Sequence, residues 1–325
     1  GNRVLGNLIG TDAFATVDLG SGRDGALANG GNGVGVYRGA SDNVIGSGTS
    51  GEGNVIGGNG VSGLVIANPD SSGNVVAGNL VGTDRNGAKS IANTRDGIVI
   101  ADAADDNRIG GDSSAGEGNV VSGNTLSGIV IVTADRTLVH GNTVGLEKDS
   151  AGVRENGGNG LYIGAGAVGT VIGGTGTGQA NVVAGNGEHG ISIDGSSSEV
   201  TTGSVIRGNL IGTDAVNSTG IGNTGDGISV AGGVEDTVIG GNSLAGEGNV
   251  VSGNGASGIA NNGADRTLIR GNVIGLKKGI DEVLGNTFDG VFVGAGSVGT
   301  VVGGAGAGQG NVVSGTGLAG IESKD

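Results

Sequence analysis

Basic side chains recur at one place in a repeated sequence pattern, directly after a pair of aliphatic residues. In alternate repeats this place holds Ala77, His140, Arg207 and Arg270, and in the repeats between it holds Gly46, Gly110, Gly173, Gly240 and Gly303. If successive repeats stack about 4.8 Å apart, the three cations stand about 10 Å from one another. The spacing predicts a cationic column beside a bare glycine surface that could cradle an anionic polymer. A solvated strand face is the alternative interpretation.

Acidic residues in Gly-rich loops form a second candidate set. Gly-Thr-Asp recurs with Asp12, Asp84 and Asp214, and Gly-Glu-Gly recurs with Glu52, Glu117 and Glu247. Calcium binds several carboxylate and carbonyl oxygens, which such loops can supply. The nonapeptide repeat of calcium-binding β-rolls is missing, however. We therefore expect either calcium at Asp12, Asp84 and Asp214 or acids that only make the loops soluble, and no other cofactor.

Residues for acid–base chemistry on a sugar are scarce. A polysaccharide lyase or glycosidase needs carboxylates, a base and usually aromatic rings for stacking. The chain has three Phe, two Tyr and no Trp, and Tyr37 and Tyr162 occupy comparable places four repeats apart. His189 is expected to be a solvated residue at a turn. Aspartates before a repeat glycine are expected to be turn residues, namely Asp96, Asp226 and Asp289.

Repeats of about 30 residues must position all of these side chains. Gly followed by alternating aliphatics recurs 30 to 37 residues apart, for example at Gly97-Ile-Val-Ile100 and Gly128-Ile-Val-Ile131. Each repeat holds two more short segments with the period-two alternation of half-buried strands. The last of them begins with an Asn, giving Asn7, Asn54, Asn79, Asn119, Asn142, Asn181, Asn209, Asn249, Asn272 and Asn311. Three short strands per repeat predict a triangular coil, and stacked coils predict an Asn column.

Composition agrees with a narrow stack of coils. With 80 Gly, one Pro and no Cys, Met or Trp in 325 residues, the chain cannot build a core of interlocking large side chains. Gly and Asn tolerate the positive φ of tight corners. Loops alternate between two places in successive coils, and Gly128–Asn142 matches Gly258–Asn272 at an offset of 130 residues, which indicates a duplicated block of four coils. The longest interruption, between Ile9 and Gly33, holds Asp18, Arg23 and Asp24 without a convincing acid–base set.

The Gly-Ile-x-Ile strands and Asn-x-Ile-x-Gly-Asn turns resemble the right-handed parallel β-helix proteins of the pectate-lyase-like superfamily, and most closely the long surface repeats of bacteria. The resemblance covers essentially the whole chain. It implies an all-β, right-handed parallel β-helix of about ten coils with three short strands each. Members include polysaccharide lyases, hydrolases and epimerases, phage tailspikes and adhesins, so the fold alone does not choose an activity.

The net charge of the chain and the regularity of its repeats determine which functions we expect. A net charge of −15 disfavours nucleic acid and anionic membranes as partners, and no apolar run is long enough to span a bilayer. Because repetition continues to both ends, we expect residues 1–325 to be a single solenoid, a fragment or stackable segment of a longer extracellular or cell-surface protein. Its partners would be flanking domains or end-to-end copies. The first hypothesis is a non-catalytic rod or adhesive surface, and the alternative is a β-helix that acts on an acidic polysaccharide.

Overall fold

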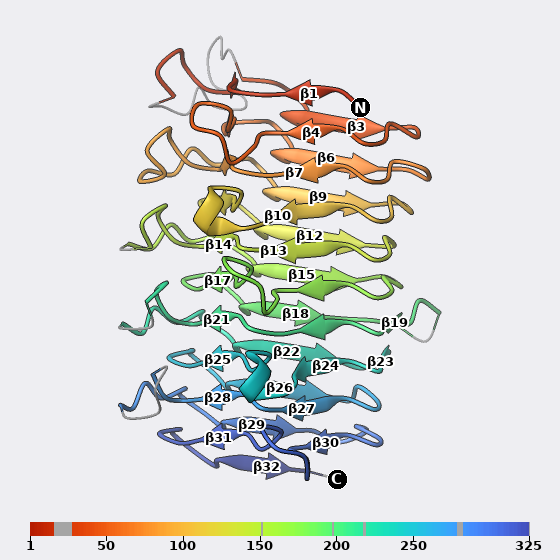
Figure 1. Ribbon diagram of the computed structural model, residues 1–325, viewed down its shortest axis with the longest axis vertical. Helices are drawn as coiled ribbons and strands as arrows, with labels where there is room; N and C mark the ends of the chain where they lie inside the picture. Colours follow the sequence, from red (N-terminus) through yellow and green to blue (C-terminus); the bar gives the residue numbers. More distant parts are fainter. Residues whose placement is uncertain (16–27, 151, 197, 217–218, 278–281, 325) are drawn as a thin grey trace.

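The chain folds into ten stacked coils of a parallel β-helix, as predicted (Figure 1). The computed structural model describes residues 1–15, 28–150, 152–196, 198–216, 219–277 and 282–324. Each coil gives one strand to each of three ten-stranded parallel sheets. Right-handed crossovers are the rule for parallel strands joined in this way. The interruption with Asp18, Arg23 and Asp24 lies outside the described residues.

The first sheet carries the predicted Gly-Ile-x-Ile strands, and the second and third sheets follow along each coil. The first sheet contains β3 (Val34–Tyr37), β6 (Leu64–Ala67), β9 (Ile98–Ala101), β12 (Ile129–Val132), β15 (Leu161–Gly164), β18 (Ile191–Ile193), β22 (Ile228–Ala231), β26 (Ile259–Asn262), β29 (Val291–Val293) and β32 (Ile321–Ser323). The second sheet contains β1 (Arg3–Val4), β4 (Val44–Ile45), β7 (Val75–Val76), β10 (Arg108–Gly110), β13 (Leu138–His140), β16 (Val171–Ile172), β20 (Val205–Ile206), β24 (Val238–Gly240), β27 (Leu268–Arg270) and β30 (Val301–Val302). The third sheet contains β2 (Leu8–Ile9), β5 (Val55–Ile56), β8 (Leu80–Val81), β11 (Val120–Val121), β14 (Thr143–Val144), β17 (Val182–Val183), β21 (Leu210–Ile211), β25 (Val250–Val251), β28 (Val273–Ile274) and β31 (Val312–Val313). We number the coils from the N-terminus, so that β1, β2 and β3 form coil 1.

A single narrow core fills the space between the three sheets. Alternate residues of each strand point inward, and identical positions of successive coils stack on one another, as Ile129 does between Ile98 and Leu161. All three side chains are fully buried, and the core runs from Val36 to Val293. Since the inward residues fix every strand, the residues between them are held at regular heights on the three outer faces.

The predicted Asn column is confirmed as a hydrogen-bonded ladder. The side-chain amide of each Asn donates to the side-chain oxygen of the Asn one coil further on, as Asn119 Nδ2 does to Asn142 Oδ1 at 2.9 Å. The ladder is unbroken from Asn7 to Asn311. A second ladder, which we did not predict, runs from Asn29 to Asn286 at the corner after the third sheet.

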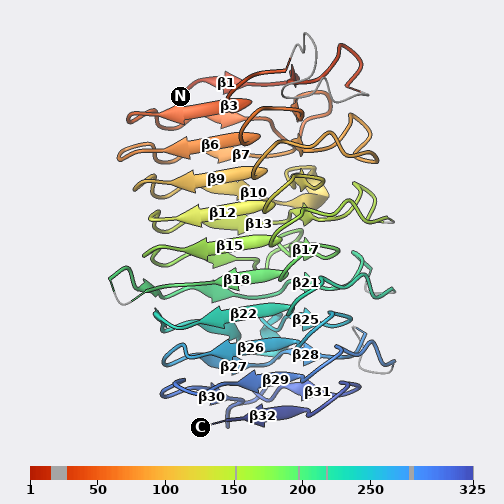
Figure 2. The same ribbon diagram turned by 180° about the vertical axis from the view of Figure 1, so that it is seen from behind.

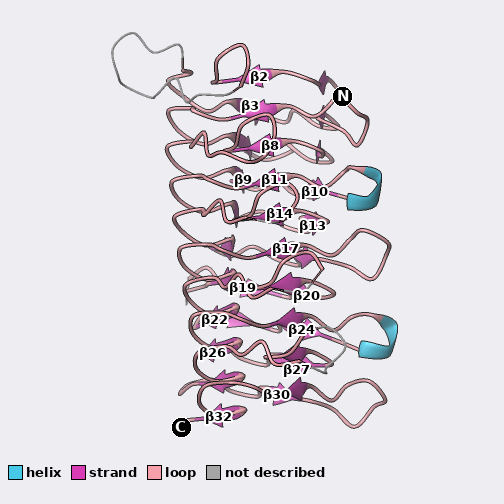
Figure 3. Cartoon of the chain, turned by 90° about the vertical axis from the view of Figure 1, so that its left-hand side faces the viewer, coloured by secondary structure: helices cyan, strands magenta, loops and turns pink. Residues whose placement is uncertain are grey.

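Longer loops leave the coils at two places in alternation, as the sequence predicts. In even-numbered coils the loop lies between the second and third sheets, and in odd-numbered coils it follows the third sheet. Two loops of the first kind contain a 3-10 turn, η1 (Ser113–Ala115) and η2 (Ser243–Ala245), which project from the same edge of the stack (Figure 3). On another edge, the short strands β19 (Thr201–Thr202) and β23 (Val234–Glu235) pair with each other (Figure 1). Figure 2 shows the stack from behind, with the first-sheet strands in chain order from β3 to β32. Within the described ranges, no helix is long and apolar enough to cross a bilayer.

Candidate acid–base site

The predicted column of His140, Arg207 and Arg270 is present in the second sheet. His140 lies in register with Gly110, and Arg270 lies in register with Gly240. The bare glycine surface, however, was a wrong prediction. Gly46, Gly110, Gly173 and Gly240 are buried with positive φ, and the space that a side chain would need is filled by the carbonyl and Asn side chain of the next coil.

The three side chains of this column differ in charge and in pairing. Arg207 lies 3.5 Å from Glu247, and its Nε is buried without a hydrogen-bond partner, as is Nε of Arg270. Burial, followed by the charges of Arg108 and Arg207, lowers the pKa of His140, which favours its neutral form. Anionic-polymer binding at this column stays a prediction.

The three aspartates considered for calcium lie in separate loops. Asp12, Asp84 and Asp214 follow the third sheet in coils 1, 3 and 7. Asp84 is 3% exposed, and its Oδ1 accepts hydrogen bonds from the backbone N–H groups of Ala88 at 2.8 Å and Lys89 at 3.0 Å. No three His, Asp or Glu side chains of the described part of the chain gather as metal ligands. Calcium binding by single loops stays a prediction.

Unlike groups converge instead on the outer face of the first sheet, in coils 5 to 7. Tyr162 on β15 lies in register with Ser192 on β18, and Ser192 lies in register with Ser229 on β22. Ser192 and Ser229 are 4% and 7% exposed although they face outward, so taller side chains stand around them. Asp194 follows β18 on the same face, next to the hydroxyls of Ser192 and Tyr162, which favour its charged form.

His189 and Asp226 complete this cluster from the corner that precedes the first sheet. His189 Nδ1 accepts a hydrogen bond from the backbone N–H of Asp226 at 3.0 Å and lies 3.4 Å from Asp226 Oδ2. Asp226 Oδ1 in turn accepts from the backbone N–H of Ser257 at 2.8 Å. Because Nδ1 is an acceptor, the proton of neutral His189 resides on Nε2. His189 lies at a turn as expected, and its side chain is 34% exposed, but it is also bonded to Asp226.

Burial raises the pKa of three members of the cluster. For Tyr162 the removal of water is the largest cause of its raised pKa, and the negative charge and hydrogen bond of Asp194 add to it. Burial also raises the pKa of Asp194 and of Asp226, while the charge of His189 acts in the opposite direction on both. Perturbed titrating groups gathered on one face are typical of a functional site.

We name Tyr162, His189, Asp194 and Asp226 the acid–base cluster. A carboxylate with a raised pKa is a better proton acceptor near neutral pH than an ordinary one. Tyr162 remains protonated and can donate, and neutral His189 can donate from Nε2. The side chain of Asp226 is only 13% exposed and is bonded to backbone, so it orients His189 and leaves Asp194 as the carboxylate available to a ligand.

The sequence contains a signal for this cluster that the periodicity conceals. Coils 3 and 4 have Ile-Val-Ile in the first strand, whereas coils 5 and 6 have Leu-Tyr-Ile and Ile-Ser-Ile. The position before the repeat glycine is Asn159, His189 and then Asp226 in successive coils. Tyr37 stands in a different column from Tyr162, because it pairs with Ala67, whereas Gly35 and Val65 belong to the column of Tyr162.

Solved structures with parallel stacks of coils are similar to this chain over most of its length. They include the periplasmic alginate epimerase AlgG (13% identity, TM-score 0.42, covering 89% of this chain and 64% of that one). The A-module of the Azotobacter vinelandii mannuronan C-5 epimerase AlgE4 is another, with 14% identity and a TM-score of 0.42, covering 99% of this chain and 88% of that one. The Dettilon tailspike protein is a third, with 17% identity and a TM-score of 0.41, covering 90% of this chain and 60% of that one. The chain thus spans less than two thirds of the AlgG structure. No known sequence family and no curated protein matches the sequence.

Proposed function

We propose that this protein acts on an acidic polysaccharide by proton transfer at the acid–base cluster. The observation that carries the proposal is that Tyr162 and Asp194 lie side by side on one outer face, with His189 and Asp226 bonded to each other at the adjoining corner. The face is open along the stack, which suits a polymer better than a small molecule. The proposal replaces the rod as the first hypothesis and agrees with an extracellular or periplasmic location, which also stays a proposal.

The residue types favour proton abstraction next to a carboxyl group over hydrolysis. Glycosidases place two carboxyl groups on either side of the scissile bond. Here Asp194 faces outward beside a phenol, Asp226 is held by backbone, and the nearby Glu188 is exposed at the preceding corner. Asp194 would take the proton from C5 of a uronate residue, and His189 Nε2–H would donate a hydrogen bond to the uronate carboxylate.

Tyr162 would donate its proton to the oxygen at C4 as the C4–O bond breaks, which is elimination. The proton on Asp194 would then pass to the adjacent Tyr162 oxygen, which restores both groups. Because Tyr162 and Asp194 lie side by side, epimerisation would instead need water to return a proton to C5 from the opposite ring face, while Asp194 releases its proton to solvent. Both outcomes begin with the same cleavage of the C5–H bond.

Deuterium uptake tests the shared step. The protein is incubated in D2O with alginate, pectate and other polyuronates, and deuterium at C5 and unsaturated products are measured by NMR. We expect turnover of at least one polymer, reduced about 100-fold or more in Asp194→Asn and Tyr162→Phe, the size of a lost general acid or base. Tyr37→Phe is the matched control on the same sheet and should retain full activity. Absence of both deuterium uptake and unsaturated products with every polyuronate, or full activity of Asp194→Asn, would return the rod to first place.

A further inference from the structure

A groove lies over the outer face of the third sheet, on a different face of the stack from the acid–base cluster. Its volume is about 600 Å³, and it extends over coils 1 to 5. Outward-facing residues of four successive strands form an apolar floor, namely Leu8, Val55, Leu80 and Val120. A volume of this size is typical of a ligand site.

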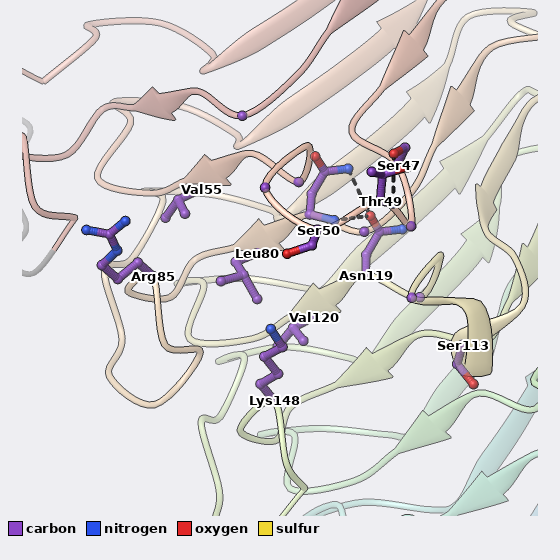
Figure 4. A pocket seen from close by; sticks show the side chains of 18 of the residues that line it. Ser47, Thr49, Ser50, Val55, Leu80, Arg85, Ser113, Asn119, Val120 and Lys148 are labelled. Carbon is purple, nitrogen blue, oxygen red and sulfur yellow. Dashed lines mark hydrogen bonds between the residues drawn. The ribbon is translucent and has the colours of Figure 1, made fainter.

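One wall of the groove consists of Gly/Ser-rich loops in coils 2 and 4. Ser47, Thr49, Ser50 and Ser113 line it together with several glycines, and Figure 4 shows Ser50 as the nearest of these to Leu80. The carboxylates of the two loops are used internally. Glu52 accepts from the Ser47 hydroxyl at 2.7 Å, and Glu117 accepts from the Asp112 backbone N–H at 3.1 Å.

The opposite side of the groove carries two cations. Arg85 and Lys148 belong to the loops that follow β8 and β14, and Figure 4 shows Val55, Leu80 and Val120 between Arg85 and the hydroxyl-bearing wall. The Lys148 backbone N–H donates to the Gly87 carbonyl at 3.0 Å, which ties the two loops together. No carboxylate of the described residues forms an ion pair with either side chain.

The charge of the groove is opposite to that of the whole chain. Arg85 and Lys148 are the charged residues that line it, and no Asp or Glu does so among the described residues, although the chain has 31 acids and 16 bases. The loops are two coils apart, so the cations stand about 10 Å from each other along the stack. Such a surface complements an extended ligand with regularly spaced anionic groups, many hydroxyls and apolar faces.

We propose that this groove is a second binding site, which holds an acidic oligosaccharide without transforming it. Arg85 and Lys148 would contact successive carboxylates, the serine and threonine hydroxyls would bond to sugar hydroxyls, and the sugar C–H faces would lie on Leu80 and Val120. The site rests on residues that the acid–base cluster does not use, and either site can exist without the other.

Calorimetric titration of the full chain with a defined oligouronate tests the groove. Its carboxyl-reduced, neutral counterpart is titrated in parallel. We expect Arg85→Gln/Lys148→Gln to weaken oligouronate binding about tenfold, the size of two exposed charge contacts. Lys89→Gln removes one positive charge from the loop of Arg85 without lining the groove, and it should retain wild-type affinity. Ser50→Trp keeps every charge but obstructs the groove, and it should abolish binding.

Three results would overturn the proposal. The first is that the neutral counterpart binds as tightly as the oligouronate. The second is that the double variant and Ser50→Trp both keep wild-type affinity, and the third is that Lys89→Gln loses as much affinity as the double variant. Asp194→Asn separates this site from the proposed activity, because it should stop deuterium uptake while groove binding persists. If turnover is found but groove binding is not, the groove proposal alone fails. If groove binding is found but turnover is not, the proposed activity alone fails.

Discussion

One turn position shows how a single side chain is used for structure and for chemistry. In several coils, the side chain of the residue before the first-sheet glycine accepts a hydrogen bond from a backbone N–H of the next coil. Asn159 accepts from His189 at 3.1 Å, Asp96 from Ser127 at 3.1 Å and Asp289 from Ala319 at 2.9 Å. The expectation that these aspartates are turn residues is confirmed. Asp226 does the same and also orients His189, so position alone does not reveal a function.

The effect of a negative charge at this position on stability can be tested at Asp96 by varying the pH. Burial raises the pKa of Asp96 above its usual value, although the Ser127 N–H and Arg95 act against the increase. The folded state therefore binds the proton more tightly than the unfolded chain, and the stability of the protein falls as pH rises through the folded-state pKa.

We expect Asp96→Asn, which keeps the acceptor and removes the charge, to stabilise the protein at neutral pH by on the order of 1 kcal/mol. The difference should vanish below pH about 4, where the carboxyl is neutral in both states. Urea unfolding over a pH series measures it. The reverse substitution, Asn159→Asp, should destabilise the protein at neutral pH. A stability difference from the wild type that does not change with pH, in either variant, would contradict the argument.

The Asn ladders are the elements that join one coil to the next at the corners. Asn119 is fully buried, its Nδ2 donates to Val76 O and Asn142 Oδ1, and its Oδ1 accepts from the backbone and side-chain N–H groups of Asn79. Such a residue cannot be removed without leaving buried polar groups unpaired on both neighbouring coils. Asn7, at the start of the same ladder, is exposed.

We expect Asn119→Ala to lower the free energy of unfolding by roughly 3 kcal/mol, because several buried donors and acceptors lose their partners. Asn7→Ala should cost under about 1 kcal/mol, since water can replace the lost bond. Chemical denaturation of the two variants gives the comparison. Equal losses would mean that burial does not set the strength of the ladder.

For the whole molecule, a net charge of −15 on a thin stack sets up self-repulsion. Arg136 and Arg266 relieve part of it, since each bonds to acids on the preceding coil, as Arg136 Nε does to Asp106 Oδ1 at 2.7 Å. These pairs are exposed and screened by salt, whereas the repulsion is spread over the whole surface.

We therefore expect the melting temperature to rise by several degrees when sodium chloride is raised from low to about 0.15 M, where the Debye length falls to about 8 Å. Scanning calorimetry measures the change. Calcium chloride at matched ionic strength is the control, because an additional rise that disappears in Asp84→Asn would support the predicted calcium site. A fall in melting temperature with sodium chloride would mean that the arginine pairs outweigh the repulsion.

Residue order by itself determined the ten coils, the three strands of each coil, the alternation of loops and the Asn7–Asn311 ladder. All of these are properties of a short period, and a side chain with the same neighbours in every coil can be placed from the sequence. The same reasoning did not predict the bond between His189 and Asp226, and it failed at Gly110. A period does not say which way a side chain turns at a corner, or that the next coil covers a glycine.

Tertiary structure alone decided where unlike groups meet. Tyr162 and Asp194 are 32 residues apart in sequence but occupy adjacent coils, and Arg85 and Lys148 belong to loops two coils apart. Stacking at about 4.8 Å converts a separation of one repeat into contact distance. The chemistry of this protein therefore depends on departures from the repeat, which the regular core then holds at fixed heights.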